Sequence, residues 1–181
     1  KDLATSLIEK LHQFYPEANI DFLLRKGNEG LLENHPILNN VLVWDKKNKK
    51  FSNLKTITKR VKNAKYDLVV NLQRFTSSGL ITAFSGAKNR VGFKKNPMSF
   101  SFTKKVEHNI GDGTHEIERN QQLIADITDT IAVNPKLYPS KENYEKVEAY
   151  KKKEYVCVAP TSVWFTKQLP KEQWVKVIRK V

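Results

Sequence analysis

The stretch Tyr66-Asp-Leu-Val-Val-Asn-Leu-Gln-Arg74 decides the fold class of this chain. Its short apolar centre, bounded by polar residues, predicts a β-strand that ends at Gln73 and Arg74. Helical patterns separate most of the comparable apolar stretches, which stand at residues 20–24, 40–44, 90–93 and 155–159. Strands that alternate with helices in this way predict an α/β fold with a doubly wound parallel sheet, covered by helices on both faces.

The helical patterns have clear limits in most places. Apolar residues at helical spacing predict helices at residues 3–14, 54–61 and 78–84. Thr114 is the expected N-cap of a further helix whose isoleucines, up to Ile131, face inward. Pro170 is expected to open the last helix. Residues 96–113 lack periodicity and predict a loop.

Parallel sheets of this kind bind ligands beyond the carboxyl ends of their strands. Polar residues that follow the strands should therefore share one edge of the sheet, namely Arg25, Asp45, Gln73, Arg74, Thr161 and Ser162. Residues 155–159 predict a strand buried on both faces, with Cys157 inside it. Such a strand would deliver two hydroxyls to a helix N-terminus, which favours phosphate. The alternative is a polar loop in which Trp164 and Phe165 serve as packing anchors.

The positive charge of the chain is concentrated in one third of its length. Its 32 lysines and arginines against 19 acids give a net charge of +13. Residues 46–106 hold 16 basic residues and a single acid, Asp67, so this segment alone carries +15. Such a field attracts polyanions, which include nucleic acid, anionic lipid head groups and phosphorylated sugars. The alternative is a solvated, lysine-rich surface without a partner.

Composition disfavours several classes of protein. No segment approaches the roughly 18 consecutive apolar residues of a membrane-spanning helix. Cys157 is the only cysteine, which excludes an internal disulfide and fits a reducing compartment. The four histidines lack the spacing of zinc ligands and no P-loop is present, so neither a metal nor a cofactor is expected. Because the chain begins on a helix and stops within one, we expect residues to be missing from both ends.

Four pieces of the chain, in order, carry a resemblance to a known family. The first is Leu3-Ala-Thr-Ser-Leu7, and the second runs from Tyr15-Pro-Glu-Ala-Asn-Ile-Asp-Phe-Leu-Leu24 through His35-Pro36 to Val41-Leu-Val-Trp-Asp45. The third joins Tyr66-Asp-Leu-Val-Val-Asn-Leu-Gln73 to Gly86-Ala-Lys-Asn-Arg-Val-Gly-Phe93. The fourth comprises His115-Glu-Ile-Glu-Arg119 and Ala159-Pro-Thr-Ser with Thr166-Lys167. Together these pieces resemble the lipopolysaccharide heptosyltransferases of glycosyltransferase family 9.

The resemblance implies a GT-B architecture, in which two Rossmann-like domains face each other across a cleft. It implies an N-terminal acceptor-binding domain at residues 1–134, a linker at 135–153, and the beginning of a nucleotide-sugar-binding domain at 154–181. The implied enzyme transfers heptose from ADP-heptose, or a related sugar nucleotide, to the lipopolysaccharide inner core on lipid A, with inversion and without a metal. It is expected in the cytoplasm, in peripheral contact with the anionic inner face of the inner membrane, and nucleic acid is not an expected partner.

The resemblance also implies roles for individual residues. Asp2 is the expected catalytic base, with Lys1 where the family has a glycine, or else an accidental end residue. Lys167 is expected to oppose the charge of the diphosphate leaving group. The residues expected to bind the nucleotide sugar are Thr161, Ser162, Thr166 and Lys167. Those expected to bind the anionic acceptor are Gln73, Arg74, Arg90, His115 and Arg119, since arginine suits bidentate contacts with phosphate or carboxylate.

Three other readings stay open. One is a basic α/β module that binds nucleic acid or another anion through residues 46–105, although an aromatic RNA-binding signature is lacking. Another is a different sugar-nucleotide enzyme, such as an epimerase. The third is a non-catalytic half that binds only an acceptor or a membrane.

Overall fold

A computed structural model describes all residues of the chain except 1, 153, 163 and 181, and it leaves the side chain of Asp2 undescribed. The chain divides into two compact units, Lys1–Tyr138 and Pro139–Val181. We call them the first and the second unit and describe each by itself.

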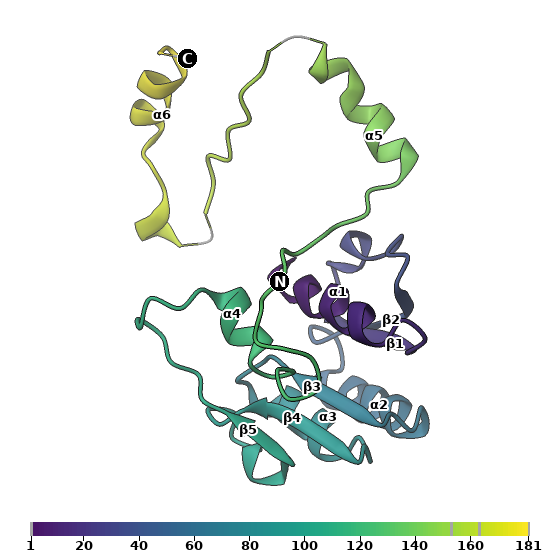
Figure 1. The fold of residues 1–181 in the computed structure, drawn as a ribbon. Helices are drawn as coiled ribbons and strands as arrows, with labels where there is room; N and C mark the ends of the chain where they lie inside the picture. The colour runs from purple at the N-terminus through teal and green to yellow at the C-terminus, as the bar shows by residue number, and fades with distance from the viewer. Residues whose placement is uncertain (1, 153, 163, 181) are drawn as a thin grey trace. The chain divides into compact units, whose positions relative to one another are not determined.

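The first unit is built on two parallel sheets (Figure 1). One pairs β1 (Ile20–Arg25) with β2 (Leu38–Trp44), and the other has the order β3 (Leu68–Asn71), β4 (Asn89–Phe93), β5 (Lys104–Val106). All three strand pairs are parallel. The predicted α/β class with parallel strands is therefore confirmed, with two sheets in place of the single sheet expected.

Helices connect these strands, as the spacing of apolar residues predicts. A 3-10 helix (Asp2–Ala4) leads into the first α-helix, and two more 3-10 helices lie at Glu29–Leu31 and Ser99–Ser101. The α-helices of the first unit are α1 (Thr5–Phe14), α2 (Lys50–Asn63), α3 (Thr76–Ala83) and α4 (Glu116–Gln121). The predicted helices at 3–14, 54–61 and 78–84 correspond to α1, α2 and α3.

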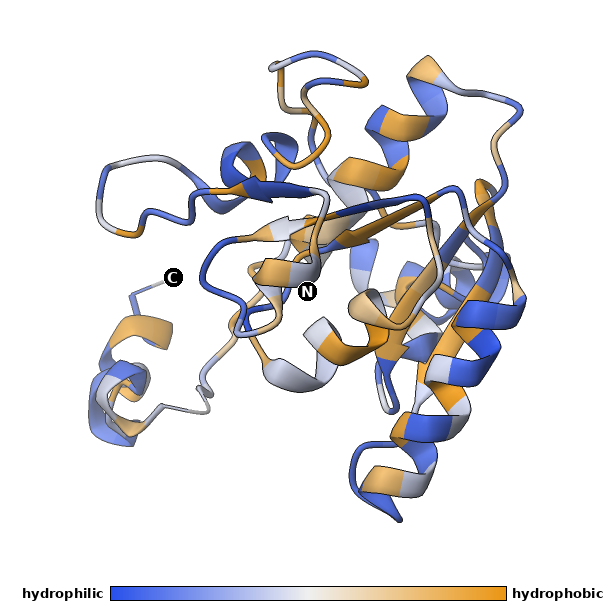
Figure 2. Ribbon diagram, turned by 90° about the horizontal axis from the view of Figure 1, so that it is seen from below, coloured by the Kyte–Doolittle hydropathy of each residue, from blue (hydrophilic) through white to orange (hydrophobic). Residues whose placement is uncertain are grey.

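Two apolar clusters hold the first unit together. The first packs Leu7 of α1 against Val91 and Phe93 of β4, together with Leu123 and Ile124 that follow α4. The second packs β2 against α2 and α3 through Leu42, Trp44, Ile57, Val61 and Ile81. Figure 2 shows that the strands are largely apolar and that the helices carry both hydrophobic and hydrophilic residues. This is the pattern expected for amphipathic helices that cover a sheet.

Two side-chain contacts tie the sheets to each other. The Tyr66 hydroxyl, just before β3, donates to the Asp21 carboxylate in β1. Burial, and then this hydrogen bond, raise the pKa of Tyr66. At the other end, the Lys46 ammonium lies 5.4 Å from the ring centres of both Trp44, the last residue of β2, and Phe75, beyond β3. Because the beginnings and the ends of the strands both meet, the carboxyl ends of the two sheets lie on one side of the unit.

Two predictions for residues 96–131 were wrong. Part of the expected loop at 96–113 is β5, a three-residue edge strand that pairs with β4 and is too short to show periodicity. The helix expected from Thr114 is only the six-residue α4, and its N-cap is His115. Ile124 is buried, whereas Ile131 is 68% exposed, because the helix ends after six residues and Ile131 lies beyond the packed segment.

The second unit contains helices and extended backbone. Its helices are α5 (Lys141–Glu148), a 3-10 turn at Ala149–Lys151, another at Phe165–Lys167, and α6 (Lys171–Ile178). Pro170 is the N-cap of α6, which agrees with the prediction that it opens this helix.

The strand predicted at residues 155–159 does not form. The backbone there belongs to no sheet, and Tyr155 and Val156 are 58% and 63% exposed. Within the described part of residues 139–181 no strand is available to pair with it, and an unpaired strand leaves its N–H and C=O groups to water. Cys157 is therefore exposed instead of buried. Trp164 and Phe165 are 68% and 86% exposed, so they are not packing anchors within this unit.

Candidate functional site

A polar pocket of about 300 Å³ opens at the carboxyl end of β3. It lies between the loop that follows β3 and the start of α4, and is lined by Leu72, Gln73, Arg74, Phe75, His108, Ile110, Glu116 and Arg119. The structure therefore brings together three of the five residues predicted to bind the acceptor: Gln73, Arg74 and Arg119. The volume is at the lower end of the range for small-molecule sites.

Hydrogen bonds hold the loop that carries Arg74 in one conformation. The buried Asn71 accepts the Gln73 N–H at 2.8 Å through its side-chain oxygen. Asn96, only 1% exposed, donates from its side-chain nitrogen to the carbonyls of Gln73 at 2.8 Å and of Phe75 at 3.2 Å. The two amides fix the backbone on both sides of Arg74, so the guanidinium is presented from a preorganised support.

A close approach of α3 keeps Asn96 in place. Gly79 of α3 faces this amide, and a Cβ at that position would lie 2.2 Å from the Asn96 side-chain oxygen and 2.7 Å from Met98. That oxygen also accepts the Met98 N–H at 2.9 Å. Only glycine permits this packing without a shift of the residues that support the loop.

The two arginines of the pocket differ in their surroundings. Arg119 is fixed: its Nη2 and Nε lie 2.9 Å and 3.2 Å from one carboxylate oxygen of Glu116, its Nη1 donates to the Thr114 carbonyl, and its side chain is only 13% exposed. Arg74 is exposed and makes no hydrogen bond or ion pair with any residue that the structure describes. One guanidinium is therefore neutralised in place, while the other remains available to an anion.

His108 completes the pocket as a buried, neutral side chain. It is 4% exposed and packs edge-on against Phe93, with ring centres 4.5 Å apart. Burial lowers its pKa; Arg74 and Arg119 lower it further, while Glu116 acts in the opposite direction. Its Nδ1 is buried and has no hydrogen-bond partner among the described residues.

This arrangement suits anion binding better than proton transfer. The pocket-lining residues include one carboxylate, Glu116, and Arg119 engages it. The exposed Arg74 can make charge-assisted hydrogen bonds to a phosphate or a carboxylate. His108 can add one hydrogen bond without adding charge.

Two predicted acceptor residues do not line this pocket. Arg90, at the amino end of β4, donates to the Ser101 carbonyl at 3.0 Å and the Ala87 carbonyl at 2.5 Å. His115 caps α4, because its Nδ1 accepts the Ile117 N–H at 3.3 Å while its own N–H donates to Glu118 at 2.8 Å. Both residues already have hydrogen-bond partners within the fold, so the structure adds no support for their predicted contact with an acceptor.

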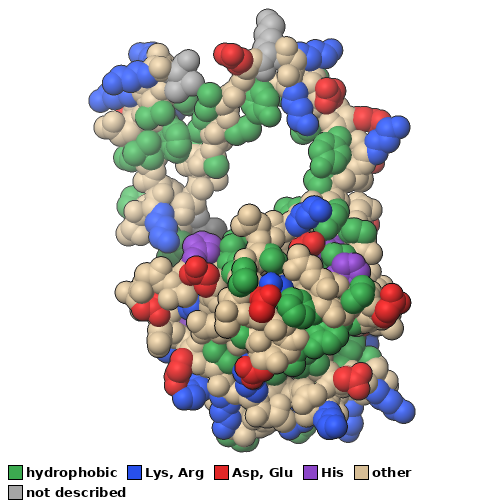
Figure 3. Space-filling model, viewed as in Figure 1, with side chains coloured by type: hydrophobic (Ala, Val, Ile, Leu, Met, Phe, Trp, Pro, Cys, Tyr) green, Lys and Arg blue, Asp and Glu red, His purple; other side chains and the backbone are tan. Residues whose placement is uncertain are grey.

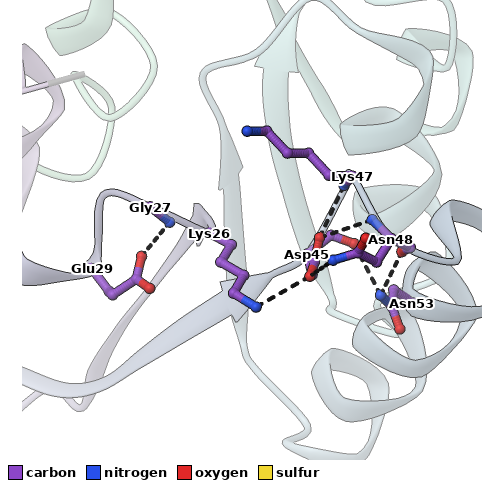
Figure 4. Close-up of polar contacts among 7 residues, drawn as sticks. All are labelled: Lys26, Gly27, Glu29, Asp45, Lys47, Asn48 and Asn53. Carbon is purple, nitrogen blue, oxygen red and sulfur yellow. Dashed lines mark hydrogen bonds and ion pairs between the residues drawn. The ribbon is translucent and has the colours of Figure 1, made fainter.

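Asp45, at the same side of the unit, serves as a turn residue (Figure 4). Its carboxylate accepts the backbone N–H groups of Lys47 at 3.0 Å and Asn48 at 3.1 Å, and Lys26 at 3.3 Å. These hydrogen bonds, with those of Asn48 largest, hold the pKa of Asp45 well below its usual value. The carboxylate therefore orders the connection from β2 to α2 and is unsuited to act as a base.

The residues predicted to bind the nucleotide sugar belong to the second unit. The Ser162 hydroxyl accepts the Trp164 N–H at 3.2 Å, and the Gln168 side chain donates to the Ser162 carbonyl at 2.6 Å. Thr166 and Lys167 lie in the 3-10 turn, exposed, and Thr161 precedes it, also exposed. The shared edge predicted for Thr161 and Ser162 with the first unit stays a prediction.

The side chain of Asp2 lies outside the described part of the chain, so its role as the base also stays a prediction. Among the residues that the structure describes, no three His, Cys, Asp or Glu side chains gather as metal ligands would. No helix in the described chain is long and apolar enough to cross a membrane.

Asn96, His108 and Glu116 are site residues that sequence reasoning missed. Asn96 and His108 fall in the segment predicted to be a loop, where no periodicity marks a buried position. The Asn-Pro pair at 96–97 was the available signal for an ordered turn.

Comparisons with known proteins agree with this fold. Residues 54–181 match the model of glycosyltransferase family 9 (heptosyltransferase). Lipopolysaccharide heptosyltransferase 3 of Escherichia coli (strain K12) is 27% identical over 188 aligned positions, which cover 97% of this chain and 55% of that protein.

Solved structures show the same architecture. A family 9 glycosyltransferase from Veillonella parvula superposes with a TM-score of 0.76 at 16% identity, over 97% of this chain and 54% of that one. The E. coli heptosyltransferase WaaC with ADP superposes with a TM-score of 0.65 at 16% identity, over 99% and 60%. The chain thus spans little more than half the length of these proteins. With most of its residues matched by the family model, the chain belongs to glycosyltransferase family 9, the heptosyltransferases.

Proposed function

We propose that this chain forms the acceptor-binding part of an enzyme that transfers heptose, or a related sugar, from ADP-heptose or a similar nucleotide to an anionic lipopolysaccharide core. The transfer inverts the anomeric centre and needs no metal. One observation carries the proposal: Arg74, which has no partner among the described residues, and a fixed Arg119 line one polar pocket at the carboxyl edge of a parallel sheet.

The acceptor side follows from the chemistry of the pocket. Core sugars on lipid A carry phosphates and carboxylates, and Arg74 binds such a group through its guanidinium. Gln73, beside it on the same loop, hydrogen-bonds to sugar hydroxyls. Arg119 and Glu116 form a fixed wall that offers both donors and acceptors. The pocket therefore offers one contact to an anionic group, at Arg74, and surrounds it with neutral or charge-paired polar groups.

The donor side rests on family membership and on residues 161–167. The E. coli relative was solved with ADP, and an adenosine diphosphate group leaves when heptose is transferred from ADP-heptose. Lys167 is exposed and forms no ion pair with the described residues, so its ammonium can stabilise that diphosphate. Thr161, Ser162 and Thr166 supply hydroxyl donors nearby in sequence. Asp2 takes the proton of the acceptor hydroxyl as the base.

The proposed domain boundaries separate the acceptor-binding residues from the donor-binding residues. We place the acceptor domain at residues 1–134, the linker at 135–153 and the beginning of the donor domain at 154–181. The linker then includes α5, whose charged residues pair with one another at i, i+4 spacing and whose side chains include none that is buried. The enzyme acts in the cytoplasm, at the inner face of the inner membrane where its lipid-linked acceptor is found.

Replacement of Arg74 by glutamine tests the acceptor pocket. Binding of a phosphorylated, delipidated core oligosaccharide, measured by titration calorimetry, should weaken by about 10-fold to 100-fold because a charge-assisted contact is lost. Arg25→Gln is the matched control, since Arg25 is also an exposed arginine at the end of a strand but does not line the pocket. Equal affinity in the Arg74 variant, or an equal loss in the control, would contradict the proposal.

A further inference from the structure

Helix α2 has a charge composition that its fold does not require. Five of its 14 residues are lysine or arginine and none is acidic. Four more lysines flank it closely, at positions 46, 47, 49 and 65. Figure 3 shows lysine and arginine side chains along the lower rim of the first unit.

The helix sorts these residues onto one side. Its inner face buries Ile57 and Val61 in the second apolar cluster. Phe51, Lys55, Lys59 and Lys62 follow one another at i, i+4, i+8 and i+11, which places them on a single outward stripe. All four side chains are exposed, and Phe51 is 78% exposed. A shallow hollow beside the stripe is lined by Lys55, Thr56, Lys59, Arg60 and Asn63.

The cations of the stripe are unpaired among the described residues, and a further lysine at the start of the helix is unfavourably placed. None of the basic residues of α2 forms an ion pair with a carboxylate in the described chain. Lys50 lies in the first turn, where the helix dipole disfavours positive charge, and Lys49 before it has a left-handed φ of 39°. Helix α5 is the contrast, because its lysines pair with acids: Lys146 with Glu142 at 2.8 Å and Lys141 with Glu145 at 3.8 Å.

We propose that the outer stripe of α2 docks on the surface of an anionic lipid bilayer. Lys55, Lys59 and Lys62 face lipid phosphates, and the exposed Phe51 ring enters the interface beside them. An anionic surface relieves the repulsion between the unpaired lysines and the unfavourable charge at the helix N-terminus. The proposal rests on the proposed function in one respect: docking on the bilayer explains how the enzyme reaches a lipid-linked acceptor.

The segment that leads into α2 lies beside the candidate pocket. Helix α2 starts at the carboxyl edge of β2, and Lys46, just before it, contacts the ring of Phe75, which lines the pocket. A membrane that touches the N-terminal end of α2 therefore lies close to the site for an anionic sugar.

The shape of the stripe favours a bilayer over nucleic acid. Single-stranded nucleic acid is held in a basic groove with aromatic side chains on which successive bases stack. The hollow beside the stripe is lined by no aromatic side chain, and Phe51 is the single aromatic residue of α2. A row of exposed lysines with one exposed apolar side chain matches an anionic lipid surface.

Vesicle binding tests this inference. Co-sedimentation with phosphatidylcholine vesicles that contain phosphatidylglycerol, at 0.1 M salt, should show binding that pure phosphatidylcholine vesicles do not. The triple variant Lys55→Gln, Lys59→Gln, Lys62→Gln should bind about 100-fold less, at about fivefold for each lysine near the surface. The same three positions changed to arginine should retain binding, and Phe51→Ser should weaken it by several-fold.

A matched variant on the second unit controls for net charge. Lys141→Gln, Lys146→Gln, Lys151→Gln removes the same charge from another exposed helical segment and should change binding less than twofold. Equal losses in the two triple variants, or no loss in the α2 variant, would overturn the proposal. So would tighter binding to an unrelated oligonucleotide than to the anionic vesicles. The delipidated oligosaccharide is measured without vesicles, so failure of the Arg74 test leaves the vesicle result independent.

Discussion

Two apolar stretches of this chain look alike in sequence and differ in structure. Residues 66–72 and 155–159 both have the pattern of a short strand, and each is followed by residues predicted to contact a ligand. The first forms β3, pairs with β4 and ends at a loop held by Asn71 and Asn96. The second is exposed backbone without a strand partner in the described chain. An apolar run specifies a strand only where a neighbouring strand accepts its hydrogen bonds.

The comparison also separates two kinds of binding residue. Arg74 is held by a loop whose carbonyls are engaged by Asn96, so its position is set before a ligand arrives. Lys167 belongs to a 3-10 turn that is exposed on all its residues. The loop that carries Arg74 loses its conformational entropy during folding. The turn that carries Lys167 would lose its conformational entropy only when a ligand or another part of the protein packs against it.

The largest expected effect comes from removing the support of the first loop. Asn96→Ala leaves the carbonyls of Gln73 and Phe75 without their donor, and we expect the free energy of unfolding to fall by about 3 kcal/mol. The loop should then resemble residues 161–167, with rapid amide hydrogen exchange near Arg74. Urea denaturation and hydrogen exchange measure the two effects. Unchanged exchange in the loop would show that Asn96 does not order it.

A pair of valine substitutions tests the comparison directly. Val91→Ala in β4 removes a side chain that is only 6% exposed and should cost about 2 kcal/mol. Val158→Ala affects a residue that is 41% exposed and should change stability by less than about 0.5 kcal/mol. Both are measured by urea denaturation. Equal costs would mean that residues 155–159 are packed in solution.

The second segment should matter for the donor and not for folding. Lys167→Gln is expected to weaken ADP binding to the enzyme by about 10-fold, which corresponds to about 1.4 kcal/mol. The midpoint of unfolding should stay the same. Lys171→Gln, an exposed lysine in the first turn of α6, is the control. If both variants bind ADP as the unchanged protein does, Lys167 has no part in leaving-group stabilisation.

The smallest effect is the contribution of His108, in the candidate pocket, to the pH dependence of stability. Because the pKa of His108 is lowered in the fold, the unfolded chain binds its proton more readily, so stability is lost as pH falls below about 6.5. His108→Leu should reduce the difference between denaturation midpoints at pH 5.5 and 7.5. Part of the difference should remain, because burial lowers the pKa of His35 in the same way. An unchanged difference would exclude His108 as a source.

Much of the first unit could be predicted because its elements leave local signals. The pattern of residues 66–74 locates β3 within two residues, and the rule for parallel sheets correctly directs attention to Gln73 and Arg74. Arg119 also lines the pocket as predicted. It belongs to α4, which forms where the sequence predicts a helix but is shorter than expected.

The remaining features depend on contacts between distant residues. His108 is buried by Phe93, and Asn96 is placed by the close approach of Gly79, and neither contact leaves a local pattern. β5 has only three residues, and alternation cannot be recognised over so short a length. The exposure of Tyr155 and Cys157 follows from the lack of a partner strand within the described residues, which the sequence of the segment itself cannot reveal.

The residue that follows Asn96 protects the Asn96 side chain, which supports the Arg74 loop, from deamidation. Asparagine side chains deamidate with age when the next backbone nitrogen attacks their carbonyl carbon, and that attack requires an N–H group. The next residue is Pro97, which has none. Conversion to aspartate would turn a donor to two carbonyls into a repelling charge, so the proline protects the geometry of the pocket over the lifetime of the protein.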